Sequence, residues 1–260
     1  MNTLSSIQEK INNAKDLDFG DIFNRCIELF KKSWLQGFLL QLFGMLLMAP
    51  VIIIFYVPLV MAMMANAEQG AYGPDMYDGI LAGFSIISIL LLIVAIIVLS
   101  AVIMCLQGAF YNILKKLDHG QTVSTSDFFI FLKGTYLAKG LVIALASFGI
   151  SLIAAMLCYL PLIYVIVPIY FFAPFFGFNS HLSVSEIINA SFKLGNKKWL
   201  ITFGLVIVSS FLATIVGYLA CGIGLLFTSA FIYHPLYFIY KDVIGFDSED
   251  AIDEIGLIED

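Results

Sequence analysis

Six long apolar runs constrain this chain more than any other feature of its sequence. They cover residues 37–65, 80–114, 140–159, 161–178, 200–220 and 225–240. A helix needs about 20 apolar residues to cross the hydrocarbon core of a bilayer. The runs follow one another in pairs, so they predict an all-α polytopic membrane protein with six transmembrane helices arranged as three hairpins.

The composition excludes the common soluble classes. Of the 260 residues, 61% are hydrophobic and only 12% are charged, whereas a soluble domain carries about 25% charged residues. One water-soluble core of this size cannot hide so much apolar surface. An acidic soluble enzyme, a disordered chain and a nucleic-acid-binding protein are therefore disfavoured, and membrane lipids are the expected surroundings.

The distribution of basic residues predicts the orientation. All thirteen Lys and Arg residues lie in the N-terminal segment, in the loops after the second and fourth runs, or in the C-terminal tail. The loops on the other side carry only Glu68, Asp75 and Asp78 as charged residues. Since cytoplasmic loops are enriched in Lys and Arg, both termini are expected in the cytoplasm. Trp34 and Trp199 closely follow lysines, which is typical of interfacial anchors at the cytoplasmic boundary.

A threefold internal repeat organises the chain. Residues 17–35 align without a gap with residues 182–200, and a weaker copy begins at Ser124. Each copy starts with the spacing of a capping box, in which a short polar side chain is followed three residues later by an acid. The three pairs are Asp18 with Asp21, Ser124 with Asp127, and Ser183 with Glu186. The expected unit is a cytoplasmic amphipathic helix followed by a hairpin. The expected organisation is a single membrane domain (1–260) with repeats 17–114, 124–179 and 183–241 and an acidic tail, 242–260.

The apolar faces of these amphipathic helices are open to two interpretations. The helices can lie in the headgroup layer and guide insertion of their hairpins. Alternatively, they can form one cytoplasmic collar that docks a protein partner. The candidate partner-docking residues are Phe19, Phe23, Ile27, Phe128, Phe129, Ile187, Ile188 and Phe192.

The runs lack the residues that would carry catalysis. None of them contains Asp, Glu, Lys or Arg, which disfavours a proton-coupled pump and a channel with a charged filter. His119, His181 and His234 are far apart in the sequence, whereas a metal centre needs three or four converging ligands. No phosphate-binding or dinucleotide-binding motif is present. We therefore expect no enzyme activity, no catalytic residue, no metal site and no cofactor.

Prolines mark a candidate solute cavity. Pro50 and Pro58 lie in the first run, and Pro168 and Pro174 in the fourth. A proline inside a helix removes a backbone donor, and broken helices line the substrate sites of many transporters. Ordinary kinked packing is the alternative. His234 joins this candidate set, as either a hydrogen-bonded imidazole at a kink or a ligand-contacting, pH-sensing group.

Two of the four cysteines, Cys158 and Cys221, fall at turns on the non-cytoplasmic side. Their placement allows a disulfide between the second and third hairpins in an oxidising compartment. Two free thiols are the alternative.

Several motifs resemble a broad bacterial group. They are the opening Asp18-Phe-Gly-Asp-Ile-Phe, the later Ser183-x-x-Glu-Ile-Ile with its Lys-Lys-Trp-Leu, and a Gly-Ile-Gly turn before the last run. They are similar to uncharacterised six-helix inner-membrane proteins and to the membrane domain attached to some glycerophosphodiester phosphodiesterases. The resemblance covers about residues 17–245 and implies a multi-pass protein of the bacterial inner membrane. These residues include no phosphodiesterase domain, so that activity is not expected.

Small Bacteroidota proteins of this kind are often labelled β-carotene monooxygenase. That enzyme type resembles a β-propeller that holds iron with four histidines. Three dispersed histidines on six predicted helices contradict the label.

Two functions from different classes follow. The first is a non-enzymatic accessory or scaffold subunit of a larger inner-membrane assembly, bound to an unidentified membrane-protein partner. The alternative is a carrier or flippase for a lipid or small hydrophobic solute, with its cavity beside the proline-broken first and fourth helices. An enzyme acting on a lipid is a distant third, because the polar residues that it needs are not clustered.

Overall fold

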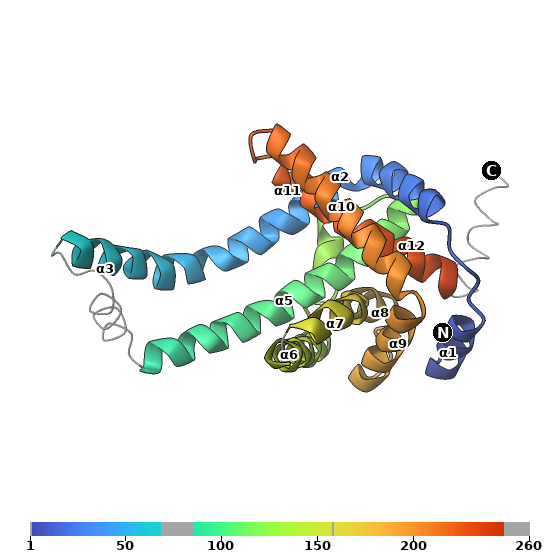
Figure 1. Cartoon of the computed structure of the whole chain (residues 1–260), viewed down its shortest axis with the longest axis horizontal. Coiled ribbons are helices and arrows are strands. Elements are labelled where there is room, and N and C mark those ends of the chain that lie inside the picture. Colours follow the sequence, from blue (N-terminus) through green and yellow to red (C-terminus); the bar gives the residue numbers. More distant parts are fainter. Residues whose placement is uncertain (1, 69–85, 158, 247–260) are drawn as a thin grey trace. The chain divides into compact units, whose positions relative to one another are not determined.

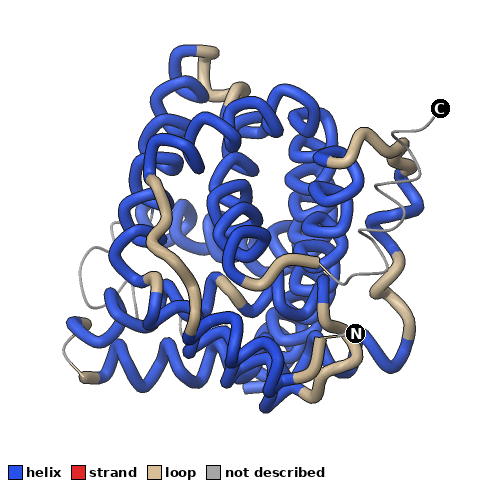
Figure 2. The backbone as a smooth tube through the Cα atoms, turned by 90° about the vertical axis from the view of Figure 1, so that its right-hand side faces the viewer, coloured by secondary structure: helices blue, strands red, loops and turns tan. Residues whose placement is uncertain are grey.

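The structure is a computed structural model that describes residues 2–68, 86–157 and 159–246. Helices and loops make up all of these residues, with no strand among them (Figures 1 and 2). The chain divides into two compact units. Unit 1 comprises residues 1–41 and 101–260, and unit 2 comprises residues 42–100. The all-α prediction is confirmed.

Five helical segments of the described chain are long and apolar enough to cross a membrane, which indicates a multi-pass membrane protein. They are Phe19–Ala65, Ser88–Asp118, Gly134–Met156, Leu160–Phe178 and Trp199–Leu219. The sixth predicted span is divided into α11 (Leu225–Thr228), the 3₁₀ helix η3 (Ser229–Ile232) and α12 (Tyr233–Val243). Pro235 lies just after this division, and its missing N–H interrupts the regular hydrogen-bond ladder.

The first amphipathic helix does not end before its span, contrary to the prediction. Helix α2 runs without a break from Phe19 to Val51. In the third repeat, α9 (Val184–Lys197) ends at Lys198, and α10 (Trp199–Leu219) follows directly. In the second repeat, only the short 3₁₀ helix η2 (Thr125–Phe129) precedes α6. The three copies therefore share a sequence pattern but not one local structure.

Unit 2 consists of two apolar helical segments. The first is the end of α2, continued by the π-helix η1 (Ile52–Tyr56) and α3 (Val57–Glu68), and the second is the start of α5 (Ile86–Asp118). The π-helix lies between Pro50 and Pro58, where the Val57 N–H bonds to the carbonyl five residues back, on Ile52. Most of the large apolar side chains described in this unit are exposed, as expected for surfaces that face lipid or another apolar partner.

Helix α12 is the central helix of unit 1. Its residues from His234 to Tyr240 are all buried. At its C-terminal end, Arg25 Nη1 of α2 donates to Asp242 Oδ1 at 2.9 Å. Asp118 at the end of α5 accepts from both Tyr237 Oη and Lys241 Nζ at 2.7 Å. These ion pairs fasten α2 and α5 to α12 at one end of the unit.

The segment that precedes α12, beginning with α11, returns alongside α10. Thr228 Oγ1 donates to the Ala213 carbonyl at 2.7 Å. A Cβ built on Gly217 would lie 2.5 Å from Leu225 Cδ2. Ser209, Ala213 and Gly217 are buried on α10, so this row of small residues forms a packing seam, as the close approach of two helices requires.

The middle of the chain forms a second group of helices in unit 1. Helices α6 (Gly134–Met156) and α7 (Leu160–Tyr170) are followed by α8 (Phe172–Phe178). In Figure 1, α6 is seen nearly end-on whereas α10 lies across the page, so these helices cross instead of running side by side. The short α8 is buried from Phe172 to Gly177. It therefore belongs to the core of unit 1.

An N-terminal helix that the sequence analysis did not predict packs against α9. Helix α1 (Leu4–Asn12) buries Ile7 and Ile11 completely or almost so. Its Gln8 Nε2 donates to Asn189 Oδ1 on α9 at 2.9 Å. This docked helix covers part of the surface that α9 would otherwise present.

The capping boxes predicted at Ser124 and Ser183 are both present. In the first, the Ser124 N–H donates to Asp127 Oδ2 at 3.0 Å, and Lys116 Nζ donates to Asp127 Oδ1 at 2.8 Å. Partial burial alone would raise the pKa of Asp127, but the bonds from Lys116 and Ser124 outweigh it and lower the pKa. The carboxylate thus joins η2 to the end of α5.

We expect Asp127→Asn to lower the melting temperature at pH 7 by about 2–4 °C, equivalent to about 1 kcal/mol. Because the pKa of Asp127 is lowered in the folded state, its carboxylate stabilises the fold fully above the unfolded-state pKa of about 3.9. This stabilisation is lost as the pH falls through the folded-state pKa. Thermal unfolding in detergent at pH 7 and pH 3 tests this. The difference in melting temperature between Asp127→Asn and wild type should be smaller at pH 3 than at pH 7. The control Glu9→Gln, which changes an exposed acid, should melt close to wild type at both pH values. An equal difference for Asp127→Asn at both pH values would contradict the prediction.

Candidate ligand site

A groove between α7 and α10 is the candidate site in unit 1. It encloses about 410 Å³, within the range of about 300–1,000 Å³ that is typical of small-molecule sites. Apolar side chains form most of its wall, with a few hydroxyl groups among them. Its lining residues are Ile166, Val167, Tyr170, Phe203, Val206, Ile207, Ser210, Phe211 and Thr214.

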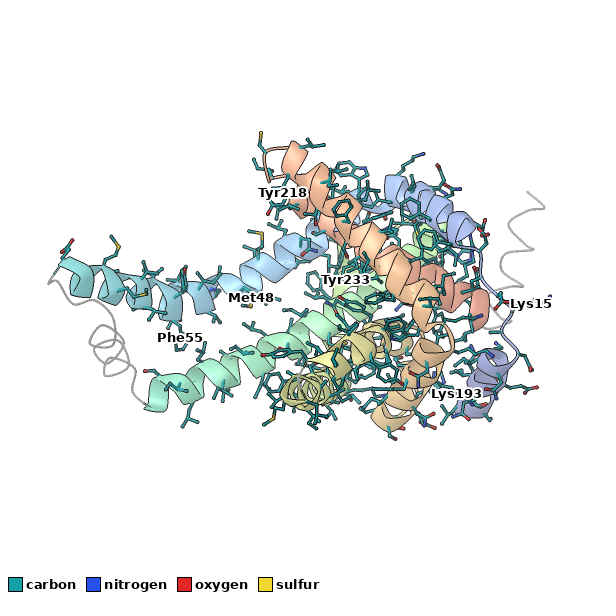
Figure 3. All side chains as sticks on the ribbon, viewed as in Figure 1. Lys15, Met48, Phe55, Lys193, Tyr218 and Tyr233 are labelled. Carbon is teal, nitrogen blue, oxygen red and sulfur yellow. The ribbon has the colours of Figure 1, made fainter. Side chains whose placement is uncertain are left out.

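Tyr170 connects this groove to two tyrosines in the interior of unit 1. Its hydroxyl is an electrostatic neighbour of those of Tyr111 on α5 and Tyr233 on α12. The rings of Tyr111 and Tyr233 meet edge to face, with their centroids 6.0 Å apart. Figure 3 labels Tyr233 among the side chains between the helices of unit 1. Helices α5 and α12 thus bring the rings of Tyr111 and Tyr233 into contact, and Tyr170 on α7 lies within electrostatic range of both.

The hydrogen bonds of this tyrosine cluster (Tyr111, Tyr170 and Tyr233) are incomplete. Gln107 Nε2 donates to Tyr233 Oη at 3.2 Å. Tyr111 has no exposed surface, and its hydroxyl has no hydrogen-bond partner among the described residues. A buried hydroxyl without a partner costs about 1–3 kcal/mol. The cluster therefore offers an unused donor close to the groove.

The cluster lies one to two helical turns from the charged end of the unit. Tyr111 precedes Lys115 and Lys116 by four and five residues and Asp118 by seven on α5, which corresponds to about 6–10 Å at 1.5 Å per residue. Tyr233 precedes Lys241 by eight residues on α12, or about 12 Å. No lining residue of the groove is ionisable apart from Tyr170. The site can therefore hold an apolar chain and bond a polar group that carries no charge.

His234 has no exposed surface and lies beside Pro235 in α12. Pro235 cannot donate to the Phe231 carbonyl four residues back, and His234 Nδ1 donates to that carbonyl instead, at 3.2 Å. Its Nε2 then accepts from the hydroxyl of buried Ser33 on α2, at 2.7 Å. This geometry supports the interpretation of a hydrogen-bonded imidazole at a kink, because both ring nitrogens already have partners within the chain.

None of the four prolines proposed to line a solute cavity is among the lining residues of the two hollows described in units 1 and 2. Val167 lines the groove in unit 1, but its neighbour Pro168 is buried against Gly195 of α9, and Pro174 is buried in α8. In unit 2 a separate hollow of about 410 Å³ is lined by Val51, Ile52, Phe55, Tyr56, Leu59 and Leu92. It follows the helix between Pro50 and Pro58. A proline displaces the backbone, so the residues beside it form the wall.

The candidate docking residues differ in their exposure. Phe128 and Ile187 have no exposed surface, so they pack inside the chain and cannot form part of a docking surface. Phe23, Ile27, Ile188 and Phe192 are half-buried. Phe19 and Phe129 expose 39% and 43% of their surface. The apolar faces of the second and third copies are thus partly used within unit 1.

The two predicted anchor residues do not lie at one level of unit 1. The Trp34 ring is 6.0 Å from that of Phe227, and the next residue, Thr228, bonds to Ala213. Ala213 is fourteen residues along α10 from Trp199, or about 21 Å. The interfacial anchor role of Trp34 and Trp199 stays a prediction.

The candidate disulfide stays a prediction. Cys158 lies outside the described residues, and Cys221 is exposed at the turn between α10 and α11. Among the described residues, no group of three or more His, Cys, Asp or Glu side chains is arranged to hold a metal ion.

Sequence reasoning missed the tyrosine cluster. The chain contains 12 tyrosines, and nothing in their local spacing sets Tyr111, Tyr170 and Tyr233 apart. The one available signal was Gln107, an amide in an otherwise apolar run. Comparison with protein-family models, with curated proteins and with solved structures found no match to this chain.

Proposed function

We propose that this protein binds a lipid or small hydrophobic solute in the groove between α7 and α10 and acts as a carrier for it. The observation that carries the proposal is the groove itself, which is apolar, of ligand size, and bordered by a tyrosine with further buried hydroxyls behind it. A carrier needs no catalytic residue, and none of the groove residues forms a nucleophile and base pair. The proposal thus favours the second of the two functions considered from the sequence.

The proposed setting is the bacterial inner membrane, crossed six times with both termini in the cytoplasm. The ion pairs of Arg25, Lys116 and Lys241 gather the ends of α2, α5 and α12 at one end of unit 1, in keeping with a common cytoplasmic side. The sixth crossing would use residues 225–243, which return beside α10 through successive helical segments. The three predicted repeats then correspond to three successive hairpins.

A groove-filling substitution tests this proposal. In Ser210→Phe, a large ring replaces a small side chain in the groove wall. Native mass spectrometry of the purified protein should show retained ligand falling by about fivefold or more, equivalent to about 1 kcal/mol. The control is Val208→Phe, which adds a ring at an exposed position of the same helix outside the groove. Equal retention by both variants, or a wild-type protein that holds no ligand, would refute the proposal.

An accessory subunit is the second candidate. It is supported by the exposed rings of Phe19 and Phe129 and by the exposed apolar helices of unit 2. Gentle extraction from the native membrane should then yield a stoichiometric protein partner. The Phe19→Ala and Phe129→Ala variants should lose it. A protein that elutes with lipid alone would favour the carrier.

A further inference from the structure

We propose that the tyrosine cluster makes the groove selective for a neutral, carbonyl-bearing long-chain lipid, with Tyr170 as the residue that bonds the carbonyl and Tyr111 as its positioning residue. This inference rests on the proposed function, because it names the class of ligand held in the same groove. The ligand chain would lie against the apolar wall between α7 and α10. Its carbonyl would face Tyr170.

The polar side chains of the site carry hydroxyl groups, which can act as hydrogen-bond donors. Each phenol carries one O–H donor, and the Tyr233 oxygen already accepts from Gln107. The Thr214 hydroxyl donates to the Ser210 carbonyl at 2.7 Å, so it is engaged within its own helix. The remaining hydrogen-bonding capacity in the groove wall is that of the Tyr170 and Ser210 hydroxyls, each of which can donate to an acceptor such as a carbonyl oxygen.

The groove wall carries no charged side chain, which favours an uncharged ligand. The residues that line the groove include no Lys, Arg, Asp or Glu. On α5, Lys115 and Lys116 follow Tyr111 by about 6–8 Å along the helix; Lys115 lies over the ring of Phe246 and Lys116 is paired with Asp127. On α12, Lys241 follows Tyr233 by about 12 Å and is paired with Asp118. An ionised phosphate or carboxylate in such a place would pay for desolvation without a counter-ion. A neutral ester or ketone incurs no comparable penalty.

The buried Tyr111 hydroxyl supplies the independent observation. It has no partner among the described residues, although it is fully buried beside Tyr170 and Tyr233. When Tyr170 donates to a ligand carbonyl, its own oxygen becomes a better acceptor for the Tyr111 O–H, because successive hydrogen bonds polarise one another. Ligand binding would thus give the orphan donor a partner.

Four apolar probes separate these ideas. Methyl oleate has a neutral ester, sodium oleate has an ionised carboxylate and octadecene has neither, on chains of the same length. Decylubiquinone carries the carbonyl groups of a quinone on a shorter chain. Affinities would be measured by calorimetric titration of the full chain in detergent micelles. We expect methyl oleate or decylubiquinone to bind at least about fivefold more tightly than octadecene and oleate. The tighter of these two probes identifies the carbonyl as that of an acyl ester or of a quinone.

Three Tyr→Phe variants test the roles of the hydroxyls. Tyr170→Phe and Tyr111→Phe should each weaken binding of the preferred carbonyl probe by about fivefold and leave octadecene unchanged. Tyr111→Phe should also leave the melting temperature of the free protein unchanged or raise it, because it removes a buried hydroxyl without a partner. A merely structural hydroxyl would lower the melting temperature instead. The control is Tyr218→Phe, at an exposed position near the far end of α10 (Figure 3).

The outcomes distinguish this inference from the proposed function. If octadecene or oleate binds as tightly as the carbonyl probes, or if the variants do not change the affinities, the groove holds lipid but the tyrosines do not select it. If none of the probes binds and Ser210→Phe changes nothing, the carrier proposal fails together with this one.

Discussion

Substitution of Gly177 by alanine is expected to destabilise the protein by about 2–3 kcal/mol, close to the upper range for overpacking one site. Gly177 of α8 lies against Gly108 of α5, and a Cβ there would overlap the Gly108 carbonyl and come within 3.1 Å of its carbon. Backbone atoms cannot rotate out of the way as a flexible side chain can. Asn112 Nδ2 also donates to the Gly177 carbonyl at 2.9 Å, and a shift of α8 would break this bond.

Thermal unfolding in detergent and the yield of monodisperse protein measure the effect. Gly149→Ala on α6 is the matched control, because no atom lies within 4 Å of the Cβ that it would add. This control should behave like wild type. If Gly177→Ala melts at the same temperature as Gly149→Ala, the close approach of α5 and α8 is not as the structure describes it.

The sequence predicted the class of fold because apolar run length and helix caps are local properties. The capping boxes at Ser124 and Ser183 depend on residues three apart, and both are present. Helix α1 was missed although Thr3 caps it, and its buried face is formed by Ile7 and Ile11. Those two apolar residues in an otherwise polar segment become informative only when α9 is present to cover them.

The break between α9 and α10 could not be predicted from the local sequence. Ser33 and Lys198 occupy the same position in the aligned first and third repeats. Ser33 lies inside the continuous helix α2 and bonds to His234. Lys198 lies at the break, where its Nζ donates to the Lys15 carbonyl at 2.5 Å. The two aligned positions therefore have different partners from distant parts of the sequence. The helix is continuous at one position and broken at the other, although the local sequences are similar.

The candidate site was only partly predictable for the same reason. The two hollows are lined in part by residues of the first and fourth runs, next to Pro50, Pro58 and Pro168, but the prolines themselves do not line them. The tyrosine cluster, however, depends on how α5, α7 and α12 meet. Tyr111, Tyr170 and Tyr233 are far apart in the sequence, and no periodicity connects them. Such a site needs the tertiary arrangement before its chemistry can be argued.

Replacement of His234 by alanine is expected to lower the free energy of unfolding by about 3–4 kcal/mol. The substitution leaves a cavity among the rings of Phe30, Phe110 and Phe231, whose centroids lie 5.3–6.5 Å from one another or from the imidazole. Truncation of a large buried side chain costs about 2–5 kcal/mol. It also leaves the Phe231 carbonyl and the Ser33 hydroxyl without the partners that His234 provides.

A double-mutant cycle with Ser33→Ala separates these contributions. Ser33→Ala alone should cost about 1 kcal/mol, because only one hydrogen bond is lost and the packing is nearly unchanged. In the double variant the cost should be smaller than the sum of the two single costs, since no orphan hydroxyl remains opposite the missing imidazole. Unfolding free energies in detergent provide all four corners of the cycle. Strict additivity would show that the Ser33–His234 bond contributes nothing, and that the histidine acts only by filling space beside the proline.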